Sequence, residues 1–334
     1  MNPISETTAI SIRGLTVEYG LGRRLFGRSK TVKAVDEVSL DILKGESFGL
    51  VGESGCGKST LGKAIARLID PSAGTILYEG RDLTTLSSRA MRSERKNMQM
   101  IFQDPYASLN PRMTVGASIG EPLQAFGMSD RKAMAASVGR LLEDVGLNAK
   151  LATRYPHEFS GGQRQRVGIA RALAAEPAFI VADEPISALD VSIQAQILNL
   201  LKRLQAERDL TYLFISHDLR AVRYIADRVA VMYLGRIVEL GDAREVYGGP
   251  LMPYTQALLS AIPVADPVIE AKRERIVLKG DVPSAVDPPS GCRFHTRCPY
   301  AVPDCSTVTP QLVEIKPRHY AACIRISSEH PQIS

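Results

Sequence analysis

The feature that most constrains this chain is a glycine-rich octapeptide at residues 52–59. It fits the pattern Gly-x4-Gly-Lys-Ser and lies between an apolar strand-like segment, Ser47–Val51, and a segment with helical spacing, Thr60–Leu68. Glycines in such a loop let backbone N–H groups point at phosphate oxygens, and the helix that follows adds the positive end of its dipole. We therefore predict a phosphate-binding loop, in which Lys58 contacts the β- and γ-phosphates of a nucleotide and Ser59 ligates Mg²⁺. The loop is formed by Gly52, Glu53, Ser54, Gly55, Cys56, Gly57, Lys58 and Ser59, and Thr60 follows it.

Two acidic residues, Asp183 and Glu184, end a second apolar strand, Phe179–Ala182. Open α/β sheets bind ligands at the carboxyl ends of their strands. Asp183 is therefore predicted to hold Mg²⁺, and Glu184 to polarise an attacking water as a general base. A solvated acidic turn is the alternative interpretation, and the phosphate-binding loop elsewhere in the chain argues against it.

Two further polar residues follow predicted strands in the same half of the chain. Gln103 ends Asn97–Phe102 and is predicted to bridge Mg²⁺ and the attacking water. His217 follows Leu213–Ser216, and we expect it to contact the γ-phosphate. Either residue alone would be uninformative, since an isolated histidine is more often structural than catalytic.

The composition is that of an ordinary globular protein, with 45% hydrophobic and 23% charged residues. The net charge of +5 is too small to indicate a nucleic-acid partner. No apolar run approaches the roughly 20 residues of a membrane helix, and Met1–Ile10 lacks the pattern of a secretory signal. We expect a cytosolic chain that reaches a membrane only through partners.

Helices between apolar strands predict a parallel α/β core. Strand signals fade between residues 104 and 175, where Arg131–Val145 and Gln163–Ala174 have helical spacing, and this indicates a helical insertion into the core. Prolines become frequent after residue 247 and exclude long helices there. We predict one domain over residues 1–247 and an extension over residues 248–334. Additional strands are predicted at Ile10–Glu18, Val32–Ile42 and Arg228–Tyr233.

The extension contains four of the five cysteines: Cys292, Cys298, Cys305 and Cys323. Four thiolates suit Zn²⁺ or an iron–sulfur cluster, with unliganded or disulfide-bonded cysteines as the remaining alternatives. Zinc ribbons usually contain Cys-x2-Cys pairs, and this sequence has none. Any metal would be structural, because these cysteines lie far in sequence from the predicted nucleotide site.

Ser160, Gly161, Gly162 and Gln163 open one of the predicted helices and form a second candidate anion site. Together with the phosphate-binding loop, Gln103, Asp183-Glu184, the segment Ser187–Asp190 and His217, they make the chain resemble the ATP-binding cassette (ABC) family. Phe159 stands where the family usually has Leu, at an apolar packing position. The resemblance implies a P-loop NTPase fold with a RecA-like parallel-sheet core, an N-terminal antiparallel β part and a helical insertion.

The resemblance also implies the cofactors ATP and Mg²⁺ and a head-to-tail dimer. Ser160–Gln163 of one subunit would cover the γ-phosphate bound by Lys58 of the other, with Asp190 at the same interface. Tyr19 would stack on adenine, because it ends the first predicted strand ahead of the loop.

A narrower resemblance covers nearly the whole chain. Gln103–Arg112 and Leu251–Leu259 are similar to segments of the ATPases of oligopeptide and dipeptide importers, in particular the subunit conventionally lettered F. It implies a second, D-type ATPase subunit, two integral membrane permease subunits, an extracytoplasmic peptide-binding protein and no nucleic acid. It places the chain peripherally on the cytoplasmic face of the plasma membrane, with Asp104–Thr114 contacting the permeases. It also implies a [4Fe–4S] cluster on the four cysteines.

Three alternatives remain open at this point. Nickel and glutathione importers share much of this sequence. A soluble ABC ATPase acting on ribosomes or DNA would usually carry two cassettes or a long coiled coil, and neither is present here. A P-loop kinase would leave Ser160–Gln163 unexplained.

Overall fold

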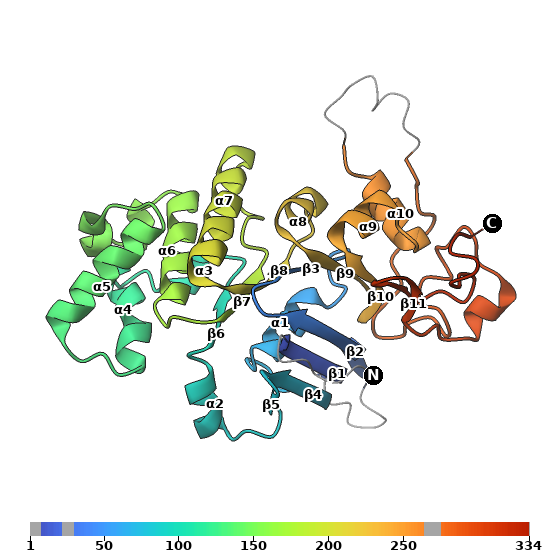
Figure 1. The fold of residues 1–334 in the computed structure, drawn as a ribbon, viewed down its shortest axis with the longest axis horizontal. Helices are drawn as coiled ribbons and strands as arrows, with labels where there is room; N and C mark the ends of the chain where they lie inside the picture. The colour runs from blue at the N-terminus through green and yellow to red at the C-terminus, as the bar shows by residue number, and fades with distance from the viewer. Residues whose placement is uncertain (1–7, 22–29, 264–274, 334) are drawn as a thin grey trace.

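A computed structural model describes residues 8–21, 30–263 and 275–333. The chain forms two sheets with a helix between them, a group of helices at one end and the extension at the other (Figure 1). Residues 1–7, which hold most of the segment searched for a secretory signal, lie outside the described residues. None of the helices in the described ranges has the length and hydropathy needed to cross a bilayer.

The larger sheet confirms the predicted parallel core. Its strand order is β11-β12-β10-β9-β3-β8-β7-β6, and the five strands from β9 to β6 run parallel. All residues of β3, β7 and β8 are buried, which explains their uninterrupted apolar sequences. The parallel strands are β3 (Ser47–Val51), β6 (Met98–Ile101), β7 (Phe179–Asp183), β8 (Thr211–Ile215) and β9 (Arg228–Tyr233).

The smaller sheet is antiparallel, with the order β2-β1-β4-β5. Its inward side chains, such as Ile10, Ile12 and Leu15, belong to one apolar core with Phe48 of β3 and Leu61 of α1. Helix α1 is therefore held between the two sheets. The elements are β1 (Thr8–Leu21), β2 (Lys30–Leu43), α1 (Lys58–Ile65), β4 (Ala73–Tyr78) and β5 (Arg81–Asp82).

The predicted helical insertion lies between β6 and β7 and forms the group of helices at one end of the molecule (Figure 1). Helix α5 begins after Asp130, whose side chain accepts a hydrogen bond from the Lys132 N–H, so a sequence-local cap fixes its start. The insertion comprises α3 (Pro105–Ser108), α4 (Val115–Ala125), α5 (Arg131–Asp144), η1 (Ala149–Thr153), η2 (Pro156–Glu158) and α6 (Gly161–Leu173). The other core helices are α2 (Ser88–Glu94), α7 (Val191–Arg208), α8 (Leu219–Ile225) and α9 (Ala243–Gly248).

The extension continues the core sheet. Strand β12 pairs with β10 through Glu239↔Ala321, and β11 adds the last strand. The buried carboxylate of Glu239 accepts hydrogen bonds from the N–H of Leu251 and of Met252 and lies 2.7 Å from His319 Nε2. These contacts tie both ends of the extension to one core strand. Its elements are α10 (Pro253–Ser260), η3 (Pro303–Ser306), β11 (Val313–Lys316) and β12 (His319–Ala321), next to β10 (Arg236–Asp242).

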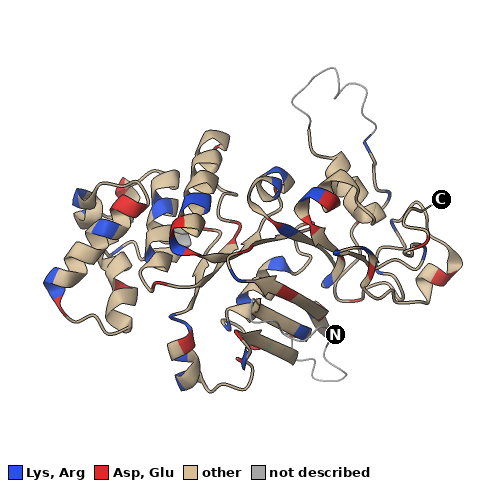
Figure 2. Cartoon of the chain, in the orientation of Figure 1, with Lys and Arg blue, Asp and Glu red and all other residues tan. Residues whose placement is uncertain are grey.

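Charged side chains of both signs are interspersed over the helices and both sheets (Figure 2). This distribution agrees with the small net charge of +5.

Candidate active site

The phosphate-binding loop connects β3 to α1, as predicted from its sequence context. A Cβ atom at Gly52 would lie 2.2 Å from the carbonyl oxygen of Met232, and one at Gly57 would lie 2.0 Å from that of Ala34. Both glycines also have positive φ values, +151° and +110°. Only glycine fits these two positions, because the neighbouring backbone leaves no space and larger residues rarely adopt this conformation.

Lys58 is the first residue of α1, and its side chain is buried under the loop. Its ammonium group donates to the carbonyl oxygens of Gly52 and Glu53, at 2.8 and 2.9 Å. Within the part of the chain that the structure describes, Lys58 forms no ion pair with a carboxylate. The positive charge is therefore available to an anion inside the loop. Thr60 follows as the third residue of α1.

Cys56 lies inside the loop, with its sulfur 3.8 Å from Lys58 Nζ. Burial raises the pKa of the Cys56 thiol, and the nearby Lys58 charge opposes this only in part. The thiol is therefore protonated at neutral pH and is a poor nucleophile. With the thiol protonated, the backbone amide of Cys56 is the group that can donate to a phosphate in the loop.

Two of the three predicted Mg²⁺ ligands, Ser59 and Asp183, meet although they are far apart in sequence. The hydroxyl of Ser59 donates to Asp183 Oδ1 at 2.7 Å, which brings the start of α1 to the carboxyl end of β7. Burial raises the pKa of Asp183, and the hydrogen bond from Ser59 lowers it only partly. A hydroxyl and a buried carboxylate are a suitable oxygen donor pair for Mg²⁺, whose charge would offset the cost of burying the carboxylate.

Glu184 is contacted by two other predicted catalytic residues, Gln103 and His217. Gln103 Nε2 donates to Glu184 Oε2 at 2.9 Å, and His217 Nδ1 lies 3.1 Å from Oε1. The three residues follow β6, β7 and β8, so neighbouring parallel strands deliver them to one edge of the sheet. The Glu184 side chain is 14% exposed, so water can reach its carboxylate. This arrangement can take a proton from a bound water molecule.

Ser160–Gln163 form the start of α6. The Ser160 hydroxyl accepts from the Gln163 N–H at 3.3 Å, while the Gln163 side chain accepts from the Ser160 N–H at 3.0 Å, which is a complete capping box. Ser160 and Gly161 are exposed. No hydrogen bond or ion pair between described residues joins this segment to the phosphate-binding loop, and α6 lies apart from α1 (Figure 1).

The packing and exposure of three residues in and around this segment bear on its function. Phe159 is buried, as expected for a packing residue. Gly162 lies against α7, where a Cβ atom would be 2.5 Å from Ile193 Cγ2. Asp190 is exposed at the start of α7. Ser160 and Asp190 are therefore both accessible to another molecule.

Tyr19 lies on β1, where it pairs with Val32, and it is 43% exposed. An aromatic ring with this exposure can stack on a planar ligand. Its role against adenine stays a prediction.

The extension contacts the phosphate-binding loop directly. Arg297 donates from both terminal nitrogens to the Glu53 carboxylate, at 2.8 and 3.2 Å, and the Glu53 N–H donates to the Tyr254 hydroxyl at 2.9 Å. This region is far from the nucleotide site in sequence and contacts it in the fold, because distance along the chain does not measure distance in space. Sequence reasoning missed Arg297 and Tyr254, and no motif or periodicity marked them as contacts of the loop.

The four cysteines of the extension line one small cavity. All five cysteines of the chain are free thiols in the structure. Burial raises the pKa of Cys298 and Cys323, and that of Cys292 to about 11. Among the described residues, no three His, Cys, Asp or Glu side chains are arranged as a metal-ion site. The thiols thus share a cavity without standing in a ligating geometry.

Comparison with known proteins finds two family models along the chain. Residues 35–187 match the ABC transporter model, and residues 238–305 match the model of the oligopeptide/dipeptide transporter C-terminal region. The putative oligopeptide transport ATP-binding protein YkfD of Bacillus subtilis is 58% identical over 89% of this chain and 91% of its own length. The oligopeptide transport ATP-binding protein OppF of Salmonella typhimurium is 49% identical over 98% of this chain and 99% of its own.

Solved structures show the same cassette. The dimeric, post-hydrolysis structure of MJ0796 bound to ADP and Pi has a TM-score of 0.63 and 28% identity, covering 70% of this chain and 99% of that chain. The structure of cbiO1 from Clostridium perfringens has a TM-score of 0.63 and 27% identity, covering 73% of this chain and 92% of that chain.

Proposed function

Because this chain belongs to the ABC transporter ATP-binding proteins of the oligopeptide/dipeptide importer family, we propose that it hydrolyses ATP to power peptide uptake across the cytoplasmic membrane. The observation that carries the chemistry is the convergence of Gln103, Glu184 and His217 beside the Ser59–Asp183 pair. A single-cassette chain with a peptide-transporter C-terminal region fits an importer better than a ribosome- or DNA-associated ATPase.

Each residue has a defined task in this mechanism. The loop amides and Lys58 bind the β- and γ-phosphates. Ser59, Asp183 and Gln103 would hold Mg²⁺, which when bound would neutralise charge on the phosphoryl group. Glu184 accepts a proton from the attacking water at one carboxylate oxygen. Gln103 and His217 hold that carboxylate in place, and His217 also contacts the γ-phosphate.

The proposal includes a head-to-tail ATPase dimer, in which the partner is a different, D-type chain. Its support is the exposed start of α6, which has no bond to its own phosphate-binding loop among the described residues, and the dimeric state of the similar MJ0796 cassette. Ser160–Gln163 would cover the nucleotide bound by the partner, and Asp190 would lie at the same interface.

Ser160→Arg tests the dimer. The variant should bind ATP normally but fail to dimerise with its partner ATPase, because a cation with a long side chain would fill the interface. Gel filtration with ATP measures the loss. Ser87→Arg is the matched control, since Ser87 also caps a helix, α2, with the same 3.3 Å bond to a backbone N–H. Normal ATP-dependent dimerisation of Ser160→Arg would contradict the proposed interface.

The proposed permease contact is the segment Asp104–Thr114. Tyr106 is 53% exposed, and the Arg164 guanidinium lies 4.4 Å from its ring centroid. Arg171 of α6 also donates to the Ser108 carbonyl oxygen. The segment is thus bonded to the helix whose start would cover the partner's ATP, so dimer closure and permease movement would be mechanically linked.

Purification from membranes with the neighbouring subunits tests the transport function. Two permease subunits should co-purify, and reconstituted vesicles should take up peptides in an ATP-dependent manner when the extracytoplasmic peptide-binding protein is present. Uptake of nickel or glutathione in place of peptides would overturn the peptide assignment. Recovery with ribosomes or DNA, and without permeases, would overturn the importer and its place at the cytoplasmic face of the membrane.

We also propose that Cys292, Cys298, Cys305 and Cys323 hold a [4Fe–4S] cluster, with Zn²⁺ as the alternative metal. The support is that all four thiols line one cavity and that four thiolates are the usual ligand set of such a cluster. Binding would require the thiols to lose their protons and move into ligating positions. Anaerobic purification followed by absorbance spectroscopy and metal analysis tests the proposal. A colourless protein with stoichiometric zinc would overturn the cluster.

A further inference from the structure

The second residue of the phosphate-binding loop, Glu53, is held by the C-terminal extension. The Arg297 side chain is 8% exposed and makes a two-pronged ion pair with the Glu53 carboxylate. Such a pair fixes orientation as well as charge, since both terminal nitrogens of the planar guanidinium are engaged. Glu53 raises the pKa of Arg297 further above its ordinary value, so the guanidinium stays charged.

The backbone of Glu53 is held as well. Its N–H donates to the hydroxyl of Tyr254, a completely buried residue of α10. The Tyr254 ring packs against Tyr233 of β9 and Phe294 of the extension, with centroid distances of 4.7 and 5.4 Å. A hydroxyl on a ring packed on two sides has little freedom to move, so the start of the loop is anchored to a rigid group.

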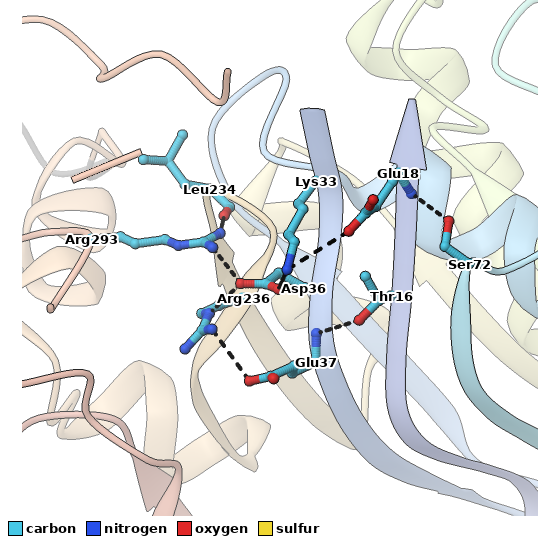
Figure 3. Close-up of polar contacts among 9 residues, drawn as sticks. All are labelled: Thr16, Glu18, Lys33, Asp36, Glu37, Ser72, Leu234, Arg236 and Arg293. Atoms are coloured by element: carbon cyan, nitrogen blue, oxygen red, sulfur yellow. Dashed lines mark hydrogen bonds and ion pairs between the residues drawn. The ribbon is translucent and has the colours of Figure 1, made fainter. Parts of the chain in front are cut away.

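A second arginine of the extension reaches the other side of the loop indirectly. Arg293 donates to the Leu234 carbonyl oxygen and to the Asp36 carboxylate (Figure 3). The next residue, Gly235, donates its N–H to the Cys56 carbonyl oxygen at 2.8 Å. The extension therefore supports the turn between β9 and β10, and that turn supports the middle of the loop.

We propose that Arg297 is a positioning residue for ATP binding, through which the C-terminal extension sets the shape and charge of the phosphate-binding loop. This inference rests on the ATP site proposed above. A loop that is already ordered loses less conformational entropy when ATP binds. The guanidinium also neutralises Glu53, whose carboxylate would otherwise repel the phosphates from within the loop.

The direct test is the ATP dissociation constant of the full-length chain carrying Arg297→Ala, measured by isothermal titration. We expect affinity to fall about 10-fold, the effect of removing a charged hydrogen-bonded partner. Arg318→Ala is the control, because Arg318 also joins the extension to the core, through a 2.9 Å ion pair with Asp242. Asp242 pairs with Arg228 at the end of the sheet opposite the loop. The ATP affinity of Arg318→Ala should therefore equal that of the wild type.

Two further variants separate positioning from simple unfolding of the extension. Glu53→Gln combined with Arg297→Ala should recover much of the lost affinity, because it removes the unpaired carboxylate. Arg297→Lys should be intermediate, since it keeps the charge and loses the two-pronged geometry. Amide hydrogen exchange of residues 54–59 should increase in Arg297→Ala and stay unchanged in Arg318→Ala.

The possible outcomes are distinct. Wild-type affinity in Arg297→Ala would overturn the inference and leave the ATP site standing. A double variant that binds no better than Arg297→Ala would also overturn it. A wild-type chain that fails to bind ATP would instead overturn the proposed function.

Discussion

At the scale of single residues, Glu184 combines backbone strain with a fixed side chain. Its φ angle is +47°, in the left-handed region that residues other than glycine rarely adopt. Its N–H donates to the Ile215 carbonyl oxygen at 2.9 Å, and Gln103 and His217 hold its carboxylate. Strain at a residue held from several sides is typical of functional positions, because the surrounding contacts maintain it.

We expect Glu184→Gln to bind ATP with unchanged affinity and to lose hydrolysis by about 100-fold or more, because an amide keeps the shape and cannot accept the proton. Phosphate release and ATP titration measure the two effects. Glu207→Gln is the control, since Glu207 is an exposed carboxylate on α7 whose one ion-pair partner among the described residues is Arg203. Turnover at the wild-type rate in Glu184→Gln would show that another group is the base.

At the scale of elements, the distance between α1 and the core sheet determines whether Ser59 and Asp183, two of the proposed Mg²⁺ ligands, meet. A Cβ atom at Gly62 of α1 would lie 2.6 Å from Ile215 Cδ1 and 2.9 Å from Val181 Cγ1. Glycine therefore lets α1 lie directly on β7 and β8. This close approach brings Ser59 within 2.7 Å of Asp183.

We expect Gly62→Val to lower the free energy of unfolding by about 1–3 kcal/mol, because the added methyl groups overpack this contact. Mg²⁺-dependent ATP binding should weaken as well, since Ser59 moves with the helix. Urea unfolding and ATP titration are the measurements. In the matched control Gly168→Val, the glycine is also helical, and a Cβ there would meet no atom of another element within 4 Å. Equal losses in both variants would mean that helix propensity, and not packing, causes the effect.

At the scale of the whole molecule, Asp36 joins three regions. This buried residue of β2 pairs with Arg236 of β10 at 2.8 Å, with Arg293 of the extension and with Lys33 (Figure 3). Burial alone would raise the pKa of Asp36, but the hydrogen bond from Arg236 and the charges of Arg293 and Lys33 outweigh it. The pKa is therefore below the ordinary 3.8.

A lowered pKa stabilises the folded chain at pH values above that of the unfolded carboxyl, about 3.8. Asp36→Asn should therefore lower the free energy of unfolding at pH 7 by about 3 kcal/mol, since it removes a buried carboxylate that pairs with the partly buried Arg236 and Arg293. The difference in unfolding free energy between the variant and the wild type should shrink as the pH falls below about 3.8. The unfolded carboxyl of Asp36 binds a proton there, and the folded one follows at its lower pKa. Unfolding by urea at several pH values measures this.

Asp41→Asn serves as the comparison for Asp36→Asn. Asp41 lies on the same strand, and its pair with Arg13 is partly exposed, with side chains 39% and 24% accessible. Exposed pairs contribute little, so its effect should be small at every pH. A pH-independent loss in Asp36→Asn would contradict the electrostatic explanation.

Local patterns predicted the parts of the fold that depend on neighbours in sequence. β3 was predicted with its observed bounds, and α6 begins near Ser160 because a capping box is a sequence-local signal. Helices α4 and α7 and strands β10 to β12 were not predicted. The short strands β11 and β12 have no strong alternation of apolar residues. They form because β12 can pair with β10, and β11 with β12.

By itself, the sequence determined the family of this protein, its phosphate-binding loop and the acidic pair, because each is a short contiguous motif whose chemistry follows from its residue types. The sequence also placed Gln103, Glu184 and His217 after strands of one core, and the strand order β8-β7-β6 then brings them into contact. Only the tertiary structure decided that Arg297 lies on Glu53, 244 residues away along the chain. No periodicity in the sequence marks an arginine and a glutamate as partners. They meet only because the extension folds back onto the core sheet.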